Sequence, residues 1–118
     1  MSYFRQLVVW QKAHQLTLEI YQFTKLFPRE ETYGLTAQIR GAARSIPTNL
    51  AEGCGREGDN ELARFCVIAR GSASELEYHL LLAHDLKLID QDYGRLAEQT
   101  IEIKKMLTAL IQKLNAER

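Results

Sequence analysis

Apolar and small residues recur at alternating spacings of four and three along four separate segments of this chain. That spacing places them on one face of a helix, because an α-helix completes a turn in about 3.6 residues. No segment alternates apolar and polar residues over the length of a strand. The four predicted faces are Val9, Ala13, Leu16, Ile20, Phe23 and Phe27; Leu35, Ile39, Ala42, Ile46, Leu50 and Cys54; Leu62, Cys66, Ala69, Ala73, Leu76, Leu80 and Ala83; and Leu96, Thr100, Ile103, Leu107, Leu110 and Leu114.

The connections between these segments are short, so that consecutive helices of about 20 to 28 residues each are expected to run antiparallel. Pro28 ends the first helix, because the residue before a proline disfavours helix. Asp59 is the expected N-cap of the third helix, and Asp90 or Asp92 that of the fourth. We therefore expect an all-α fold, an antiparallel up-down-up-down four-helix bundle that forms a single domain over residues 1–118.

Two details of the second and third helices test this interpretation. Pro47 lies inside the second helical pattern and removes an amide donor there, so it predicts a kink; alternatively, Ser45 caps a new helix that starts near Pro47. Small residues in both helices predict a close approach of the two axes, although an ordinary alanine-rich helix has the same composition. The small residues are Gly41, Ala42 and Ala43 in the second helix and Ala69, Gly71, Ser72, Ala73 and Ser74 in the third.

The sequence carries no recognisable catalytic or metal-binding constellation. A di-iron bundle needs Glu-x-x-His motifs, and none of His14, His79 and His84 stands three residues after a glutamate. The string at residues 53–58 has the letters G-x-G-x-x-G, but a helix precedes it where a nucleotide-binding fingerprint needs a strand. It is interpreted as a helix end and a turn.

The two cysteines differ in their expected reactivity. Cys66 lies on an apolar face and is expected to be inert, whereas Cys54 lies near a helix end beside Arg56 and is a candidate for a mildly reactive thiol. Taken together, these observations predict a protein that is not an enzyme, with no metal or other cofactor and no small-molecule substrate.

Cellular location is constrained by what the chain lacks. Its longest apolar runs have four residues, from Leu7 to Trp10 and from Leu80 to Ala83, so no membrane partner is expected. The N-terminus has no signal-peptide pattern, and the two cysteines suit a reducing compartment. A cytoplasmic location is therefore expected.

Charge is unevenly distributed, although 15 basic and 15 acidic side chains give a net charge of zero. Neutrality excludes a polybasic tail, yet Arg40 and Arg44 lie one helical turn apart, Arg56 follows the helix end, and Lys12 lies on the first helix. These four residues are the candidate nucleic-acid-binding site. Two other interpretations stay open: pairing with the acidic third helix of another subunit, and plain solvated surface.

More apolar residues exist than four faces can hold, which favours a homo-oligomer. A wider core inside one bundle is the rival explanation. Trp10 and Tyr21 are candidate interface anchors by residue type, and Arg70, Glu75 and Glu77 are candidates for ion pairs at an interface. The surplus residues are Tyr3, Phe4, Leu7, Trp10, Tyr21, Ile68, Leu81 and Leu82.

Several strings carry a resemblance to a known family that covers nearly the whole chain. The strings are Phe4-Arg5-Gln6-Leu7, Val9-Trp10-Gln11-Lys12-Ala13, Tyr33-Gly34-Leu35-Thr36, Gln38-Ile39-Arg40, Ala42-Ala43-Arg44-Ser45-Ile46-Pro47, Asn49-Leu50-Ala51-Glu52-Gly53, Gly55-Arg56 and the stretch from Ile68 to Glu77. With them the chain resembles the four-helix-bundle proteins encoded by intervening sequences of bacterial large-subunit ribosomal RNA genes. That family is similar in fold to the accessory variability proteins of diversity-generating retroelements.

The resemblance implies a ring-like homopentamer without known catalysis, with RNA as the natural partner and DNA as a possible one. The related retroelement proteins bind a reverse transcriptase and RNA through basic surface. The resulting hypothesis is a non-catalytic oligomeric bundle that associates with RNA through a basic stripe. The alternative is a protein–protein scaffold or accessory subunit that binds no nucleic acid directly.

Overall fold

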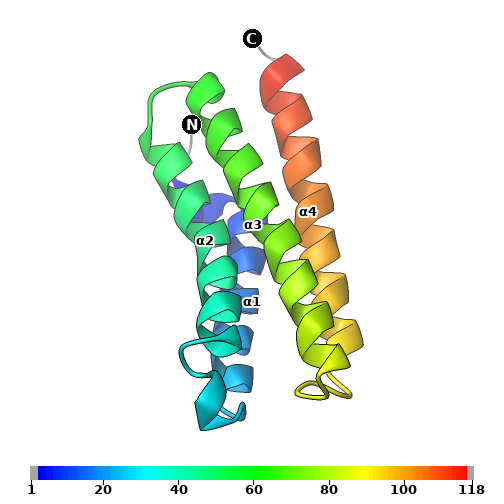
Figure 1. Cartoon of the computed structure of the whole chain (residues 1–118). Coiled ribbons are helices and arrows are strands. Elements are labelled where there is room, and N and C mark those ends of the chain that lie inside the picture. Colours follow the sequence, from blue (N-terminus) through cyan, green and yellow to red (C-terminus); the bar gives the residue numbers. More distant parts are fainter. Residues whose placement is uncertain (1–2, 117–118) are drawn as a thin grey trace.

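The computed structural model describes residues 3–116, which form four α-helices and contain no β-strand. Figure 1 shows that each helix runs opposite to the one before it, so the predicted all-α four-helix fold is confirmed. A short 3-10 helix precedes the first α-helix, and another lies in the first connection. The elements are η1 (Phe4–Gln6), α1 (Val8–Thr24), η2 (Arg29–Glu31), α2 (Leu35–Gly55), α3 (Asp59–Asp85) and α4 (Tyr93–Ala116).

The four helices form an elongated bundle of 47 × 22 × 19 Å, but they do not pack equally. α3 lies against both α2 and α4 along most of its length, whereas α1 packs on α2 and touches α4 over a shorter stretch (Figure 1). The contact between α1 and α4 is therefore the weakest of the four helix–helix contacts.

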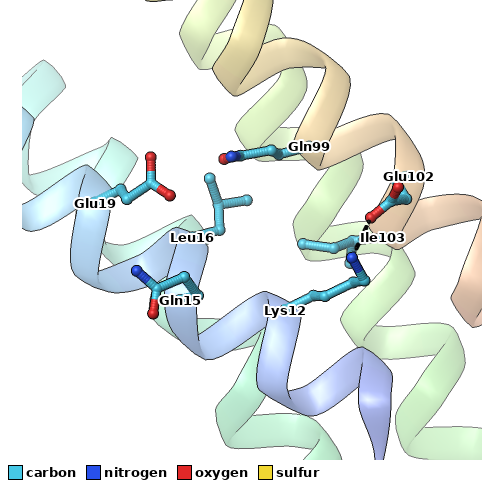
Figure 2. A pocket seen from close by; sticks show the side chains of 7 residues that line it. All are labelled: Lys12, Gln15, Leu16, Glu19, Gln99, Glu102 and Ile103. Atoms are coloured by element: carbon cyan, nitrogen blue, oxygen red, sulfur yellow. Dashed lines mark ion pairs between the residues drawn. The ribbon is translucent and has the colours of Figure 1, made fainter.

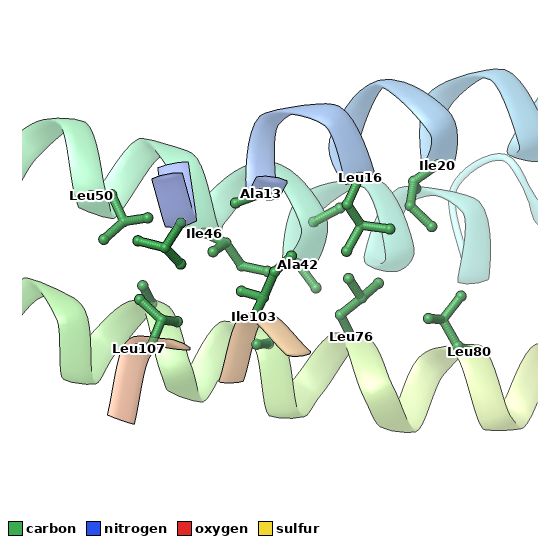
Figure 3. Close-up of a cluster of buried hydrophobic side chains, with 14 of the residues drawn as sticks. Ala13, Leu16, Ile20, Ala42, Ile46, Leu50, Leu76, Leu80, Ile103 and Leu107 are labelled. Atoms are coloured by element: carbon green, nitrogen blue, oxygen red, sulfur yellow. The ribbon is translucent and has the colours of Figure 1, made fainter. Parts of the chain in front are cut away.

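The core contains side chains from all four helices, and Figure 3 shows Leu16, Ile46, Leu76 and Ile103 pointing into it from α1, α2, α3 and α4 respectively. Most of the predicted apolar faces are buried. The prediction is wrong at a few helix ends, where the face turns away from the core. Phe23, Cys54 and Leu110 are only partly buried, and Ile111 is buried although it was not predicted.

Two predicted helix ends are displaced. α1 ends at Thr24, before the expected stop at Pro28. Asp59 is not the N-cap of α3 but its first residue; Gly58 holds the cap position, with φ of +86°, a backbone conformation that only glycine adopts without strain. Residues 53–58 form the end of α2 and a turn, as predicted, and α4 begins directly after Asp92.

α2 continues through Pro47 without interruption, which excludes a separate helix capped by Ser45. Proline has no N–H, so the carbonyl of Ala43 lacks its usual donor within the helix. The hydroxyl of Thr17 on α1 compensates, because its Oγ1 lies 3.1 Å from the Ala43 oxygen while also bonding the Ala13 carbonyl at 2.8 Å. A side chain from the neighbouring helix thus satisfies the carbonyl that Pro47 leaves free.

The predicted close contact between the second and third helices is confirmed. The hydroxyls of Ser45 and Ser72 hydrogen-bond across it at 2.7 Å. A Cβ added at Gly53 would lie 2.8 Å from the Cβ of Phe65, which leaves no room for any other residue there. Four of the predicted small residues are buried in this contact, whereas Gly71 and Ser74 are exposed. The buried four are Ala42, Ala43, Ala69 and Ala73.

Candidate nucleic-acid interface

Arg40 and Arg44, two of the predicted nucleic-acid-binding residues, meet at Tyr21 where α1 and α2 lie side by side. The guanidinium carbon of Arg40 lies 4.9 Å from the centre of the Tyr21 ring. Nη1 of Arg44 donates a hydrogen bond to the Tyr21 hydroxyl at 3.2 Å. Neither arginine forms an ion pair with a carboxylate of the described residues. Their charges are therefore not neutralised by a neighbouring side chain.

Contacts with α1 fix the position of Arg40. Its Nε donates to Oγ1 of Thr24 at 2.7 Å, and its Nη2 donates to the carbonyl of Tyr21 at 3.2 Å. The Thr24 hydroxyl is buried and donates in turn to the carbonyl of Ile20 at 2.7 Å, so it accepts from Arg40. The remaining N–H groups of the guanidinium stay available to a ligand, because arginine has five donors.

The other two predicted residues, Lys12 and Arg56, lie elsewhere and are paired. Lys12 forms an ion pair with Glu102 of α4 at 2.9 Å, and Arg56 one with Glu52 of its own helix at 3.0 Å. Lys12 lies nine residues before Tyr21, and this spacing places the two side chains on opposite sides of α1. Because Tyr21 faces α2, Lys12 faces α4. The structure therefore brings together only Arg40 and Arg44 of the four predicted residues.

Two further cations that the sequence analysis did not select lie close to Arg40. Lys25 and Arg29 line a hollow of about 350 Å³ at the connection between α1 and α2, together with Arg40. Neither is ion-paired with a described carboxylate. The helical pattern cannot reveal them, because Lys25 follows the last residue of α1 and Arg29 begins η2.

The five predicted interface residues all make contacts within the chain. Trp10 stacks on His14 with ring centres 4.9 Å apart, and Tyr21 lies under the two arginines. Nη1 of Arg70 donates to the hydroxyl of Thr108 at 3.2 Å. Two acidic side chains complete the set: Glu77 pairs with Lys104 at 2.8 Å, and Glu75 with His79 at 3.2 Å. These contacts leave the proposed interface role of the five residues a prediction.

The outer side of α3 carries an exposed apolar stripe, formed by Val67, Tyr78 and Leu81, and Ile68 is also exposed but lies on a different side of the helix. Between 40 and 58 % of each residue is exposed. Val67 and Tyr78 are eleven residues apart, which places them on the same side of the helix, opposite the buried face. Among the predicted surplus residues, Tyr3 is also exposed, whereas Leu7, Trp10 and Leu82 pack against the core. The rival explanation of a wider core thus accounts for part of the surplus only.

A narrow crevice of about 130 Å³ separates α1 from α4, and Figure 2 shows the side chains that line it. The ion pair between Lys12 and Glu102 spans it, and Arg95 of α4 pairs with Glu19 of α1 farther along the same two helices. The Oε1 of Gln99 is buried in this region and accepts no hydrogen bond from the described residues. Because its lysine is already paired with a carboxylate, the crevice offers no free cation to an anion.

Cys54, the candidate for a mildly reactive thiol, lies in surroundings that disfavour its thiolate. Partial burial raises the pKa of Cys54, and burial raises the pKa of Cys66 to about 11, with the neighbouring Cys54 adding to that shift. Both thiols are therefore protonated at neutral pH, where only the thiolate is a nucleophile.

No group of three or more histidine, cysteine, aspartate or glutamate side chains in residues 3–116 is placed to hold a metal ion. Over the same part of the chain, no helix combines the length and the apolar character that crossing a membrane requires.

Comparison with known proteins gives a family match over most of the chain. Residues 5–109 match the family described as 23S rRNA-intervening sequence protein. No curated protein matches the chain. The chain is similar in structure to a protein of unknown function from the S23 ribosomal protein family of Bacteroides thetaiotaomicron, with a TM-score of 0.80 and 24% sequence identity over 88% of this chain and 98% of the other. That similarity agrees with the four-helix fold.

Proposed function

This chain belongs to the family of 23S rRNA-intervening sequence proteins, and from that premise we propose that it is a non-catalytic, homo-oligomeric bundle that binds RNA. The resemblance drawn from the sequence is thereby confirmed at the level of the family. The proposal includes a cytoplasmic location, which is supported by the two free cysteines.

The observation that carries the RNA proposal is the cluster of four cations without a carboxylate partner among the described residues, on α2 and on the connection that precedes it: Lys25, Arg29, Arg40 and Arg44. Cations without carboxylate partners bind phosphates without first breaking an ion pair, and phosphate contacts supply most of non-specific nucleic-acid affinity. The exposed ring of Tyr33 lies in the same connection, 96% exposed, and offers a base a stacking surface. This cluster replaces the wider stripe that included Lys12 and Arg56.

Oligomer formation is supported by the apolar stripe of α3. Tyr78 and Leu81 present apolar area that a second copy of the chain would remove from water. A homopentamer, as implied by the family resemblance, would bring five copies of the cation cluster into one particle. Several weak phosphate contacts would then act together, giving an affinity that a neutral single subunit lacks.

RNA binding is tested by the affinity of the purified protein for a structured RNA over a series of salt concentrations. We expect affinity to fall as salt rises, and the Arg44→Glu variant to bind more weakly at every salt concentration. Replacing one phosphate-contacting cation lowers the slope of log affinity against log salt by about 0.7 to 0.9. Arg44 suits the test because it is exposed and makes only one side-chain contact, to Tyr21.

The matched control is Lys105→Glu, which makes the same change of charge on α4, a helix that does not contact α2. It is expected to bind RNA nearly as wild type does. Absence of any salt-dependent RNA binding by the wild-type protein would refute the proposal. Loss of assembly rather than of RNA binding in Arg44→Glu would support the scaffold alternative instead.

Oligomerisation is tested by light scattering of the wild-type protein and of Tyr78→Glu. We expect a multimer for the wild type and a smaller particle for the variant, because a buried carboxylate at an apolar interface is costly. The change lies on an exposed position of α3, so helix content measured by circular dichroism is expected to stay the same. A compact wild-type monomer at high micromolar concentration would refute the oligomer.

A further inference from the structure

We propose that the hollow between α1 and α2 binds a terminal phosphate of an RNA strand, that is, a phosphomonoester rather than a phosphodiester. The hollow has a volume of about 350 Å³ and lies at the end of the bundle drawn at the bottom of Figure 1. The inference rests on the proposed RNA binding and specifies which chemical group of the RNA is recognised. Its lining residues are Thr24, Lys25, Phe27, Arg29, Thr32, Thr36 and Arg40.

The lining carries three positive charges and no negative one. Lys25, Arg29 and Arg40 supply the cations, and no carboxylate lines the hollow. Two carboxylates, Glu30 and Glu31, belong to the same connection, but Glu31 is turned toward the start of α2, where its Oε1 accepts from the Leu35 amide at 3.5 Å. The hollow is therefore an electropositive recess in a chain whose net charge is zero.

Its inner surface is buried and partly preorganised. Thr24, Phe27 and Thr36 are each less than 10% exposed, so they form the floor. Arg40 is fixed on that floor by its bond to Thr24, with N–H groups to spare. Thr36 is 6% exposed, and its hydroxyl lines the hollow without a hydrogen-bond partner among the described residues, while its oxygen still reaches the solvent there. A hydroxyl that lines the recess can donate a hydrogen bond to a bound oxyanion.

The charge and the shape favour a terminal phosphate over a phosphodiester of a passing strand. A phosphomonoester carries about two negative charges at neutral pH, whereas each backbone phosphodiester carries one. Three cations around one recess match the more highly charged group. The recess also has a buried floor, formed by Thr24, Phe27 and Thr36, which a group at the end of a strand can approach end-on.

The test compares three RNA strands of one sequence as competitors for a bound fluorescent RNA: one with a 5′-phosphate, one with a 3′-phosphate and one with hydroxyls at both ends. We expect a terminal phosphate to raise affinity for the wild-type protein about tenfold, the effect of one well-placed charge-assisted contact. If only the 5′-phosphate or only the 3′-phosphate raises the affinity, that result identifies which end of the strand is bound. In Arg29→Gln every strand is expected to bind more weakly, because the cluster loses one cation, but the ratio of affinities between the phosphate-ended and the hydroxyl-ended strand is also expected to shrink, to about twofold.

Arg29 suits this substitution because its side chain is exposed and makes no ion pair within the described chain. Lys105→Gln is the matched control, and it is expected to keep the full advantage. Equal affinity of the wild-type protein for all three strands would overturn the inference and leave the proposed function standing. Failure of the wild-type protein to bind any of the strands would overturn both.

A second measurement locates the anion without RNA. Titration with inorganic phosphate at pH 8 is expected to shift the backbone amide NMR signals of Thr36 and Arg40, and to shift them less at pH 5.5, where phosphate loses one of its charges. The Thr36→Val variant is expected to show smaller shifts at Arg40, because it lacks the hydroxyl. Shifts spread evenly over all exposed cations, or none at all, would overturn the inference.

Discussion

Arg40 on α2 donates a hydrogen bond from its Nε to the hydroxyl of Thr24 on α1 at 2.7 Å, and that hydroxyl donates one to the Ile20 carbonyl at 2.7 Å. One buried threonine therefore connects the last turn of α1 to the arginine at the centre of the cation cluster. The bond orients a charged group without neutralising it, which an ion pair would do. The position of Arg40 therefore depends on how α2 packs against α1.

Replacing Thr24 by valine keeps the shape of the side chain and removes the acceptor for Arg40. We expect Thr24→Val to lower the free energy of unfolding by about 1 to 2 kcal/mol, as measured by urea denaturation. Thr48→Val is the control, because Thr48 is exposed and bonds only the Arg44 carbonyl of its own helix. Similar losses in both variants would show that the Thr24–Arg40 bond contributes nothing specific.

Thr17 and Pro47 are expected to be coupled energetically. Thr17→Val should cost about 1 to 2 kcal/mol of unfolding free energy, because the Ala43 carbonyl then has no donor. In a Pro47→Ala background the new N–H at position 47 can bond the Ala43 carbonyl, so the same change should cost less. A double-mutant cycle in urea measures the difference, for which we expect about 1 kcal/mol. A coupling of zero would contradict this account of Pro47.

Gly53 and Gly71 should respond in opposite ways to alanine. A Cβ at Gly53 would meet the Cβ of Phe65 at 2.8 Å and the Cδ1 of Leu62 at 3.0 Å, so Gly53→Ala should cost about 1 to 3 kcal/mol. Gly71 lies in the middle of α3, on its exposed side, with open space beside it. Gly71→Ala should therefore raise the free energy of unfolding by about 0.5 to 1 kcal/mol. Thermal unfolding of both variants is the measurement. Equal effects would mean that α2 and α3 can move apart at no cost.

Burial of Cys66 should make stability depend on alkaline pH. The pKa of this thiol rises from 9.0 to about 11 on folding, so the folded protein holds its proton where the unfolded chain releases it. The resulting stability is complete below about pH 9 and is lost as the pH rises toward 11. The difference in unfolding free energy between wild type and Cys66→Ala should therefore shrink over that range. A difference independent of pH would show that the thiol is not shielded.

The helices could be predicted because burial repeats with the helical period. Leu16, Ile46, Leu76 and Ile103 are buried as their spacing indicates, since one face of each helix must leave water. The helical repeat of buried positions weakens at the ends of the helices, because the core ends there as well. For this reason Leu110 is partly exposed and Ile111 is buried in its place. The cap of α3 was misplaced by one residue because both Gly58 and Asp59 are residues that suit helix starts.

The cation cluster could be predicted only in part. Arg40 and Arg44 are one turn apart on one helix, so their proximity follows from local geometry. The pairing of Arg56 with Glu52 could also have been predicted, because the two residues are four positions apart. The ion pair of Lys12, by contrast, depends on which carboxylate α4 places beside it, and the positions of Lys25 and Arg29 depend on the path of a connection. Neither a partner across a helix contact nor the course of a connection leaves a periodic signal in the sequence.

The weak contact between α1 and α4 has a practical consequence for anyone who purifies this protein. Two ion pairs, exposed Lys12 with Glu102 and Arg95 with the partly buried Glu19, span that contact, and concentrated salt screens such pairs while it leaves apolar packing intact. A high-salt wash chosen to strip bound nucleic acid therefore also loosens the first helix from the fourth. Melting temperatures compared between preparations are meaningful only at one common ionic strength.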